Sequence, residues 1–240
     1  MKKFALTLFS VLCFCFIGFA QDKPNTKMYG VFESKTLFQL GILEDSAGNQ
    51  IKSILRFAPF ANYTLQGHKD FSNKFGIYTG IGIKNVGFIA RYNSSDVIIK
   101  SRAYCLSIPV GLKFGNLKDD RYLFLAGEFL TQLDYKEKVF ANGDKSKRKN
   151  LYDNDINLFN YSGSIGLNVK GFVIGAEYTF NNFFADKYRF QPDKSNNAVR
   201  YAGPSKSNIL TFFIGFRTNL SAEAVAAPEK KLQQAKAYQY

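Results

Sequence analysis

Side chains that could carry nucleophilic or metal chemistry are few in this chain of 240 residues. His68 is the single histidine, and Cys105 is the single cysteine after residue 20. A serine–histidine–aspartate arrangement would need His68 with Asp70 and Ser72, but these residues lie in a short polar segment that is typical of a turn. Zinc or iron centres need several His or Cys ligands, and only these two are available. The sequence therefore predicts no enzymatic activity and no cofactor.

Two other patterns have only a partial similarity to ligand sites. Asp153, Asn154 and Asp155 offer oxygen ligands, but a calcium site needs a wider ring of them. Gly80 and Gly82 are spaced as in a phosphate loop, yet the third glycine, the Lys-Ser or Lys-Thr pair and a following helix are missing. These glycines are better interpreted as room for neighbouring side chains inside a barrel.

Basic residues interleaved with aromatic residues form the strongest candidate binding pattern. They occur in two segments that we expect to be loops, 136–155 and 185–206. The candidate anion-binding residues are Lys145, Lys147, Arg148, Lys149, Arg189 and Arg200. Such groups can bind phosphates of lipopolysaccharide, an acidic glycan or an acidic protein, and ordinary solvated loops are the alternative interpretation. The formal net charge of +13 would also suit nucleic acid, but export from the cell argues against that partner.

The first twenty residues have the composition of a cleavable signal peptide. Lys2 and Lys3 precede an apolar stretch over 4–17, and small residues stand before the polar segment that begins at Gln21. The stretch is too short to span a bilayer as a helix. We expect residues 1–20 to be removed, residues 21–220 to form an outer-membrane β-barrel, and residues 221–240 to form a periplasmic tail.

Alternation of apolar and polar residues with period two recurs after the signal and predicts β-strands. The clearest case is 100–114, where the even positions from Tyr104 are apolar and the odd positions are mostly small or polar. Eight strands are expected, at 28–42, 53–66, 74–92, 100–114, 121–135, 156–169, 172–181 and 210–217. Around Asn85 and Gly87 the apolar phase slips by one residue, which predicts a β-bulge.

Composition and connection lengths indicate how these strands assemble. Aromatic residues make up 16% of the chain, with 25 Phe and 14 Tyr, and this enrichment favours strands. Longer connections alternate with shorter ones such as the turn at Lys170 and Gly171. The pattern predicts an all-β fold, a single eight-stranded antiparallel up-and-down transmembrane β-barrel in the outer membrane with both termini in the periplasm.

Side-chain size indicates which face of each strand points inward. The apolar faces are bulky and aromatic, whereas the opposite faces are rich in Gly, Ala and Ser, and eight strands enclose only enough room for side chains to fill. We therefore expect the apolar faces in lipid and a polar network inside, because an unpaired buried ion would be prohibitive. In this network Glu128 and Glu177 contact basic partners. The candidate members are Arg56, Lys84, Lys113, Glu128, Glu177 and Arg217.

Several short motifs resemble those of a known family. The stretch 103–114, Ala-Tyr-Cys-Leu-Ser-Ile-Pro-Val-Gly-Leu-Lys-Phe, followed by Arg-Tyr-Leu-Phe-Leu-Ala-Gly-Glu at 121–128, resembles the PorT-like outer-membrane β-barrel domain of Bacteroidota. Gly171, Gly175 and Tyr178, with the closing 212–216, are similar to the family's terminal strands. The resemblance implies the fold and the location. Most members of the family have no assigned activity, and a few assist protein secretion or gliding machinery.

Three functions are compatible with the sequence. The leading hypothesis is a non-enzymatic outer-membrane barrel with a structural, accessory or binding role through basic extracellular loops. One alternative is a component of a protein secretion or gliding machinery, and another is a soluble exported barrel that carries a hydrophobic ligand. The carrier would gather Leu106, Ile174 and Phe212 around a central hollow. Expected partners are outer-membrane lipid, lipopolysaccharide and other envelope proteins, without nucleic acid.

Overall fold

The computed structural model describes residues 27–92, 97–141, 144–151, 154–190 and 201–220. The expected signal peptide (1–20) and the expected periplasmic tail (221–240) lie outside these residues. All regular structure in the described part is β-strand, and no helix there is long and apolar enough to cross a membrane. The strands are β1 (Lys27–Glu44), β2 (Gln50–Ile54), β3 (Arg56–Ala58), β4 (Tyr63–Asp70), β5 (Phe75–Tyr92), β6 (Val97–Asn116), β7 (Arg121–Ala141), β8 (Asp144–Leu151), β9 (Phe159–Val169), β10 (Phe172–Thr179), β11 (Arg189–Phe190), β12 (Tyr201–Ala202) and β13 (Lys206–Leu220).

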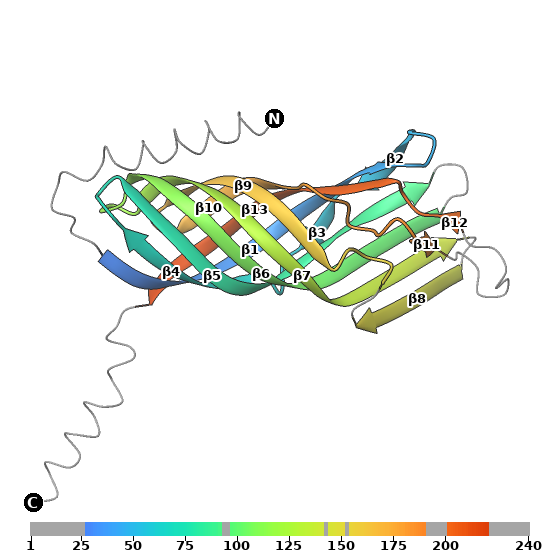
Figure 1. Cartoon of the computed structure of the whole chain (residues 1–240), viewed down its shortest axis with the longest axis horizontal. Helices are drawn as coiled ribbons and strands as arrows, with labels where there is room; N and C mark the ends of the chain where they lie inside the picture. Colours follow the sequence, from blue (N-terminus) through green and yellow to red (C-terminus); the bar gives the residue numbers. More distant parts are fainter. Residues whose placement is uncertain (1–26, 93–96, 142–143, 152–153, 191–200, 221–240) are drawn as a thin grey trace, which may run out of the picture.

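The strands close into a ring (Figure 1). β5, β6, β7, β9, β10 and β13 pair with one another in this order, and β13 pairs with β1 from Gly30↔Leu220 to Glu44↔Lys206. The position between β1 and β5 is shared by β2, β3 and β4. All these pairings are antiparallel, so eight positions surround the axis. The expected all-β fold, a single eight-stranded up-and-down barrel, is confirmed.

The two ends of the barrel differ. At one end, here the turn end, tight connections join β6 to β7 and β9 to β10, and Lys170 and Gly171 adopt positive φ angles of 52° and 84°. At the other end, here the hairpin end, β7 and β8 extend past the start of β9 (Figure 1). Both described termini, Lys27 and Leu220, lie at the turn end.

The expected second strand at 53–66 is interrupted, and this expectation was wrong in detail. The chain forms β2, β3 and β4 instead, with a break at 59–62. Pro59 has no N–H to donate to a ladder, and Ala61 adopts a φ of 62°, which is unusual for a residue with a Cβ. Asn62 stabilises the break, because its Nδ2 donates to Ala58 O at 2.8 Å and its Oδ1 accepts from the Asn85 N–H at 2.9 Å.

The β-bulge expected at Asn85 and Gly87 is absent. β5 keeps one register with β6 from Phe75↔Phe114 to Tyr92↔Val97, so Val86 and Phe88 point inward like the even residues before them. The phase change in the sequence reflects a change in the interior, which combines buried ion pairs with aromatic rings such as Phe124 toward the turn end and is apolar near the hairpin end. The irregularity lies on β7, where Tyr104 pairs with Asp134 but Cys105 pairs with Gln132. Leu133 is therefore the extra residue of a bulge.

The interior near the hairpin end is a packed apolar core, which the expectation of small and polar residues missed. Phe88, Leu130, Phe183, Phe184 and Tyr188 are almost completely buried there. The described residues between β10 and β13, 180–190 and 201–205, lie at this end (Figure 1). The rings pack closely, because Phe184 and Tyr188 stack at 3.7 Å between centroids and Phe88 meets Phe183 edge-on at 5.5 Å.

The outer wall carries a continuous apolar surface, here called the belt. Ile174 and Phe212 are each 48% exposed, so they face outward and do not surround a central hollow. The belt is made of Leu65, Ile81, Val110, Leu125, Ile165, Leu167, Ile174, Phe212 and Ile214. Aromatic pairs flank it at both ends. Near the turn end these are Phe75 with Phe114 and Phe172 with Phe216; near the hairpin end they are Phe129 with Phe159 and Tyr178 with Phe180.

Candidate anion-binding face

The segment 136–155, expected to be a loop, is largely a β-hairpin. β7 continues to Ala141, and β8 pairs with it from Asp134↔Leu151 to Ala141↔Asp144. Cross-strand partners point to the same side of a sheet, and residues two apart share a face. The pairing therefore places basic residues of three strands on one outer surface. Two cross-strand rows form this surface, here called the cationic face, and they are Arg102, Lys136 and Lys149, and Lys100, Lys138 and Lys147.

The bulge at Leu133 decides which side of β7 these lysines occupy. Before the bulge, odd-numbered residues such as Leu125 and Phe129 face outward, and after it Tyr135, Glu137 and Val139 are buried inside. The extra residue shifts the period-two phase by one position. Without it, Lys136 and Lys138 would point into the barrel.

The cationic face places like charges directly opposite one another, which is unfavourable when no ligand is bound. Like charges directly opposite each other on neighbouring strands destabilise a sheet. Partial burial lowers the pKa of Lys138, and the charges of Lys136, Lys147, Arg102 and Lys100 lower it further. A carboxylate approaches one corner, where Asp134 Oδ2 lies 3.7 Å from Lys149 Nζ. The face is therefore a strong site of positive potential with little internal compensation.

Aromatic rings flank the cationic face and hold some of its cations. The Arg102 guanidinium lies 4.6 Å from the centroid of the Tyr104 ring, and Lys100 Nζ lies 5.0 Å from that of Phe140. Lys145, on β8, lies directly opposite Phe140, and its Nζ is 5.5 Å from the centroid of the same ring. Cation–π contacts of this kind orient the side chains without neutralising their charge.

Arg148 does not belong to this face, although it was grouped with its neighbours as an anion-binding residue. Its side chain points to the inner side of the hairpin, where it pairs with Asp155 and lies 3.8 Å from Glu137. Glu137 Oε2 also accepts hydrogen bonds from Tyr135, at 2.7 Å, and from Tyr188. Burial raises the pKa of both phenols most, with the Glu137 charge raising that of Tyr135 and then Tyr135 and Glu137 that of Tyr188, so both phenols remain donors. Arg148 holds the hairpin to the core.

The other predicted basic residues have separate positions. Arg189 lies on β11 and donates through Nη1 to Tyr188 O at 2.7 Å and to Asp186 O at 3.2 Å. Arg200 lies outside the described residues. Asp153 of the considered calcium motif is also outside them, and Asp155 pairs with Arg148. No cluster of metal-ligating side chains occurs among the described residues.

The predicted interior residues lie inside the barrel, but not all of them meet. Lys84 Nζ donates to Glu128 Oε2 and to Glu177 Oε2, each at 2.5 Å. Ser107 also donates to Glu128. Arg56 does not contact these carboxylates, since its donors reach Gln39 Oε1 and Asn85 Oδ1.

Lys113 and Arg217 use carboxylates other than Glu128 and Glu177. Lys113 Nζ donates to Asp70 Oδ1 at 2.5 Å, and Arg217 Nε donates to Glu33 Oε2 at 2.5 Å. Arg217 Nη1 also donates to the Tyr122 hydroxyl at 2.8 Å. Of the four candidate bases, Lys84 is therefore the one that contacts Glu128 and Glu177.

His68 was wrongly placed in a turn. It lies on β4 with its side chain inside the barrel, where its ring stacks on Tyr78 at 5.1 Å and tilts against Tyr29 at 5.2 Å. Its Nε2 hydrogen-bonds Gln66 Oε1 at 2.9 Å. Asp70 pairs with Lys113, so the triad that would use His68 and Asp70 does not form.

Sequence reasoning missed Lys100, Arg102, Lys136 and Lys138 as members of the cationic face. The signal was the alternation of Lys136 and Lys138 with Tyr135, Glu137 and Val139, which continues the strand pattern beyond the expected end. The shift in phase at Leu133 hid it.

No known family profile matches this chain, and no curated protein is significantly similar to it. Among solved structures it is similar to Ail, the attachment invasion locus protein of Yersinia pestis, in complex with the heparin analogue sucrose octasulfate, with 14% identity over 79% of this chain and 99% of that one and a TM-score of 0.37. Neisserial surface protein A gives 9% identity over 80% and 98%, with a TM-score of 0.38. The N-terminal β-barrel domain of OprF from Pseudomonas aeruginosa gives 7% over 80% and 100%, with a TM-score of 0.32. The fold assignment rests on the strand pairing of this chain.

Proposed function

We propose that this protein is a non-enzymatic barrel that spans the outer membrane and binds a polyanion on its cationic face. The observation that carries the proposal is the pair of three-residue basic rows on β6, β7 and β8, placed next to an apolar belt on the same wall. The belt supports membrane insertion, and the rows support the ligand class.

The dimensions of the belt support a membrane-spanning wall. β9 has 11 residues. A strand of that length, with a rise of about 3.3 Å per residue and a tilt of about 45°, covers about 25 Å of hydrocarbon. Apolar bands of this height between two aromatic girdles are typical of transmembrane barrels. A soluble carrier would leave the same residues in water, so the outward direction of Ile174 and Phe212 argues against that alternative.

The strand connections support one orientation. Barrels of this class place short turns and both termini in the periplasm. The turn end, with Lys27, Lys170 and Leu220, would then face the periplasm, and the hairpin end would face outward. On β6 the outward residues run from Ile108 in the aromatic border through Leu106 and Tyr104 to Arg102 and Lys100. The cationic face would therefore stand at or above the head groups of the outer leaflet.

The arrangement of the cations favours a ligand with several negative charges. Each row contains two like-charged cross-strand contacts that cost folding stability. An anion bridging neighbouring rows, such as the phosphorylated core of lipopolysaccharide or an acidic glycan, would offset that cost. Each basic residue near an anionic surface contributes about 1 kcal/mol to such binding, and salt weakens it.

A second candidate function is a subunit of a protein secretion or gliding complex, as the resemblance to the PorT-like family implies. The observation that favours it is β8, which pairs only with β7 among the described strands. Among the described strands none covers its other edge, which could pair with a strand of another protein. Co-purification of a stoichiometric partner that is lost when Lys145 is changed to Pro would support this candidate, because the Lys145 N–H lies on the edge away from β7.

The polyanion proposal is tested by binding to purified lipopolysaccharide and to heparin. The mature chain in detergent is compared with a Lys136→Glu, Lys138→Glu, Lys147→Glu variant, and the matched control reverses three exposed basic residues at the turn end, Lys74, Lys118 and Arg121. We expect the face variant to bind at least about tenfold more weakly to one of the polyanions, and the control to bind as wild type. Equal affinities of all three proteins for both probes would rule the proposal out.

A further inference from the structure

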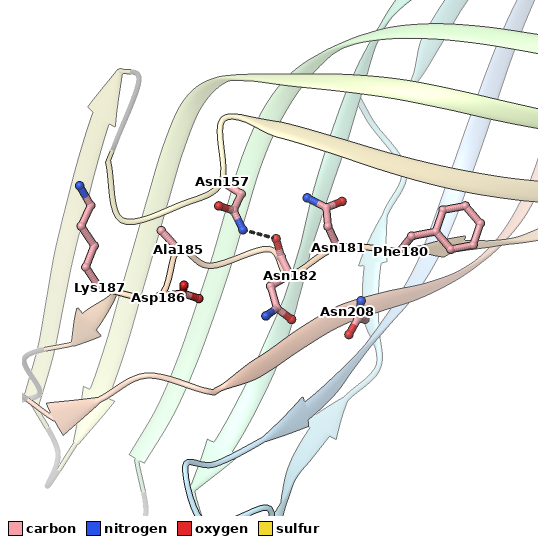
Figure 2. A pocket seen from close by; sticks show the side chains of 8 residues that line it. All are labelled: Asn157, Phe180, Asn181, Asn182, Ala185, Asp186, Lys187 and Asn208. Atoms are coloured by element: carbon pink, nitrogen blue, oxygen red, sulfur yellow. Dashed lines mark hydrogen bonds between the residues drawn. The ribbon is translucent and has the colours of Figure 1, made fainter. Parts of the chain in front are cut away.

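Two clefts on the outer wall meet at the side chain of Phe180. The first is an apolar groove of about 610 Å³ over β6, β7, β9, β10 and β13, and Leu125, Gly127, Ile165 and Leu210 contribute to its lining. The second, of about 670 Å³, lies on the hairpin-end side of Phe180 and is lined mainly by polar side chains (Figure 2). The apolar cleft and the polar one thus adjoin each other at Phe180.

The groove exists because two neighbouring strands carry glycine at outward positions. Gly127 on β7 pairs with Gly163 on β9. A Cβ at Gly127 would meet no atom within 4 Å, so packing within the chain does not require glycine there. A Cβ at Gly163 would lie 2.8 Å from the ring of Phe180. Phe180 therefore leans over Gly163 and lines the groove on the side of the polar cleft, while the space at Gly127 stays open.

The polar cleft has a fixed shape. Asn157 Nδ2 donates to Asn182 O at 2.8 Å, a bond drawn in Figure 2, and to Phe184 O at 3.0 Å. Asn182 Nδ2 donates to Ser205 O at 3.1 Å and Asn181 Nδ2 to Phe159 O at 2.9 Å. These bonds hold the chain after β10 in place. Figure 2 shows Asp186 and Lys187 at the far side of the cleft from Phe180, and both side chains are exposed.

We propose that the two clefts together bind one glycolipid of the outer leaflet, with an acyl chain in the groove and a phosphorylated sugar head group in the polar cleft. The ammonium group of Lys187 would meet a phosphate, and Asp186 with the asparagine amides would meet sugar hydroxyls. This inference rests on the proposed membrane-spanning function, because the groove lies within the belt. The site is separate from the cationic face, which is built on β6, β7 and β8.

The apolar lining of one cleft and the polar lining of its neighbour favour a glycolipid as the occupant. Hydrocarbon surrounds the belt, so an acyl chain gains little from leaving lipid and gains mainly by close packing in a hollow of matching width. Polar contacts at one end of the chain are then needed to fix one lipid in place. A second copy of the barrel would cover the groove but would leave the polar cleft without complementary groups.

The test uses the full mature chain, purified in mild detergent and examined by native mass spectrometry with added lipid A or phosphatidylethanolamine. Gly127→Leu fills the groove, and Lys187→Ala removes the cation of the polar cleft. The matched control is Gly67→Leu, because Gly67 is also an exposed strand glycine whose added Cβ would meet nothing within 4 Å, and it lies on β4 outside the groove. We expect wild type and Gly67→Leu to retain one lipid A, and Gly127→Leu to retain it at least tenfold less.

Lys187→Ala should weaken binding of lipid A at least threefold, and it should weaken the binding of phosphatidylethanolamine less, because the phosphate of that lipid already has an ammonium group beside it. Equal retention of lipid A by Gly127→Leu and Gly67→Leu would overturn the inference, as would a dimer that only Gly127→Leu disrupts. Alkaline carbonate extraction of the membranes separates this result from failure of the proposed function. A wild-type barrel that stays in the membrane pellet but shows no groove-dependent lipid contradicts only the lipid site, whereas release into the supernatant contradicts membrane insertion itself.

Discussion

Glu33 and Arg217 are direct cross-strand partners at the seam where the last strand of the barrel meets the first, and Arg217 Nε donates to Glu33 Oε2 at 2.5 Å. Both side chains are buried, and Lys35 Nζ approaches the same carboxylate at 2.7 Å. Removal of one member of a buried pair leaves the other without compensation. The ion pair therefore ties the closure of the ring to a specific register between β1 and β13.

Arg217→Met should lower the free energy of unfolding by about 3–5 kcal/mol, because Glu33 would remain buried with the partly exposed Lys35 as its one remaining cation among the described residues and the neutral Gln66 amide as a further donor. Urea unfolding of the barrel refolded into lipid vesicles measures this change. The exposed Arg121 on β7 provides the control, and Arg121→Met should change stability by less than about 0.5 kcal/mol. A double variant with Glu33→Gln should recover part of the loss; strictly additive effects would show that the pair is not coupled.

The Lys84 cluster should respond unequally to loss of its members. Two carboxylates, Glu128 and Glu177, share the one ammonium group of Lys84. Lys84→Met would leave two negative charges close together inside the barrel, whereas Glu128→Gln would leave one neutral ion pair. We expect the first change to destabilise the barrel by at least about 2 kcal/mol more than the second in the same unfolding assay. Similar losses for the two variants would contradict this arrangement.

The bulge at Leu133 predicts which residues of the hairpin are accessible from outside. Lys138→Cys in whole cells should react with a membrane-impermeant maleimide, because Lys138 lies on the cationic face. Val139→Cys should not react, because Val139 is buried, and the native Cys105 is buried as well. The reverse labelling pattern would mean that β7 continues without the bulge. Absence of labelling at both positions would place the hairpin end in the periplasm.

The apolar core at the hairpin end predicts a strong difference between inward and outward phenylalanines. Phe88→Ala should cost about 3–5 kcal/mol of unfolding free energy, since the cavity is enclosed by Phe183 and Phe184. Phe212→Ala on the belt should cost less, because lipid can fill the space that the ring leaves. Measured unfolding curves in which Phe212→Ala is the more damaging change would reverse the assignment of inner and outer faces.

The sequence alone predicted the eight-stranded architecture because alternation over long strands is a strong signal. Lys84, Glu128 and Glu177 were also recognised as candidate members of an interior network. The partners of Lys113 and Arg217 were not predictable, since cross-strand and cross-barrel contacts depend on register and shear. Asp70 was missed for another reason, because polar residues on the inner face near a strand end have the same composition as a turn.

The cationic face shows a further limit of reading strands by period. A single extra residue at Leu133 interchanges the two faces of β7, so the strand appeared to end at Tyr135. At Val86 and Phe88 a bulge was predicted where none exists. These residues keep the inward phase of the strand, but the side chains that fill the interior become apolar at this point. Both cases required knowledge of the neighbouring strands, which a local pattern does not contain.

The phenylalanine-rich core at the hairpin end fills the interior of the barrel there, so the described residues leave no open channel along the axis. A small solute that entered the barrel at the turn end would be stopped by this packed apolar core. In the proposed orientation, an anion bound by the exterior lysines would remain on the outer side, and the cell could detect it only through movement of the barrel wall or through another protein.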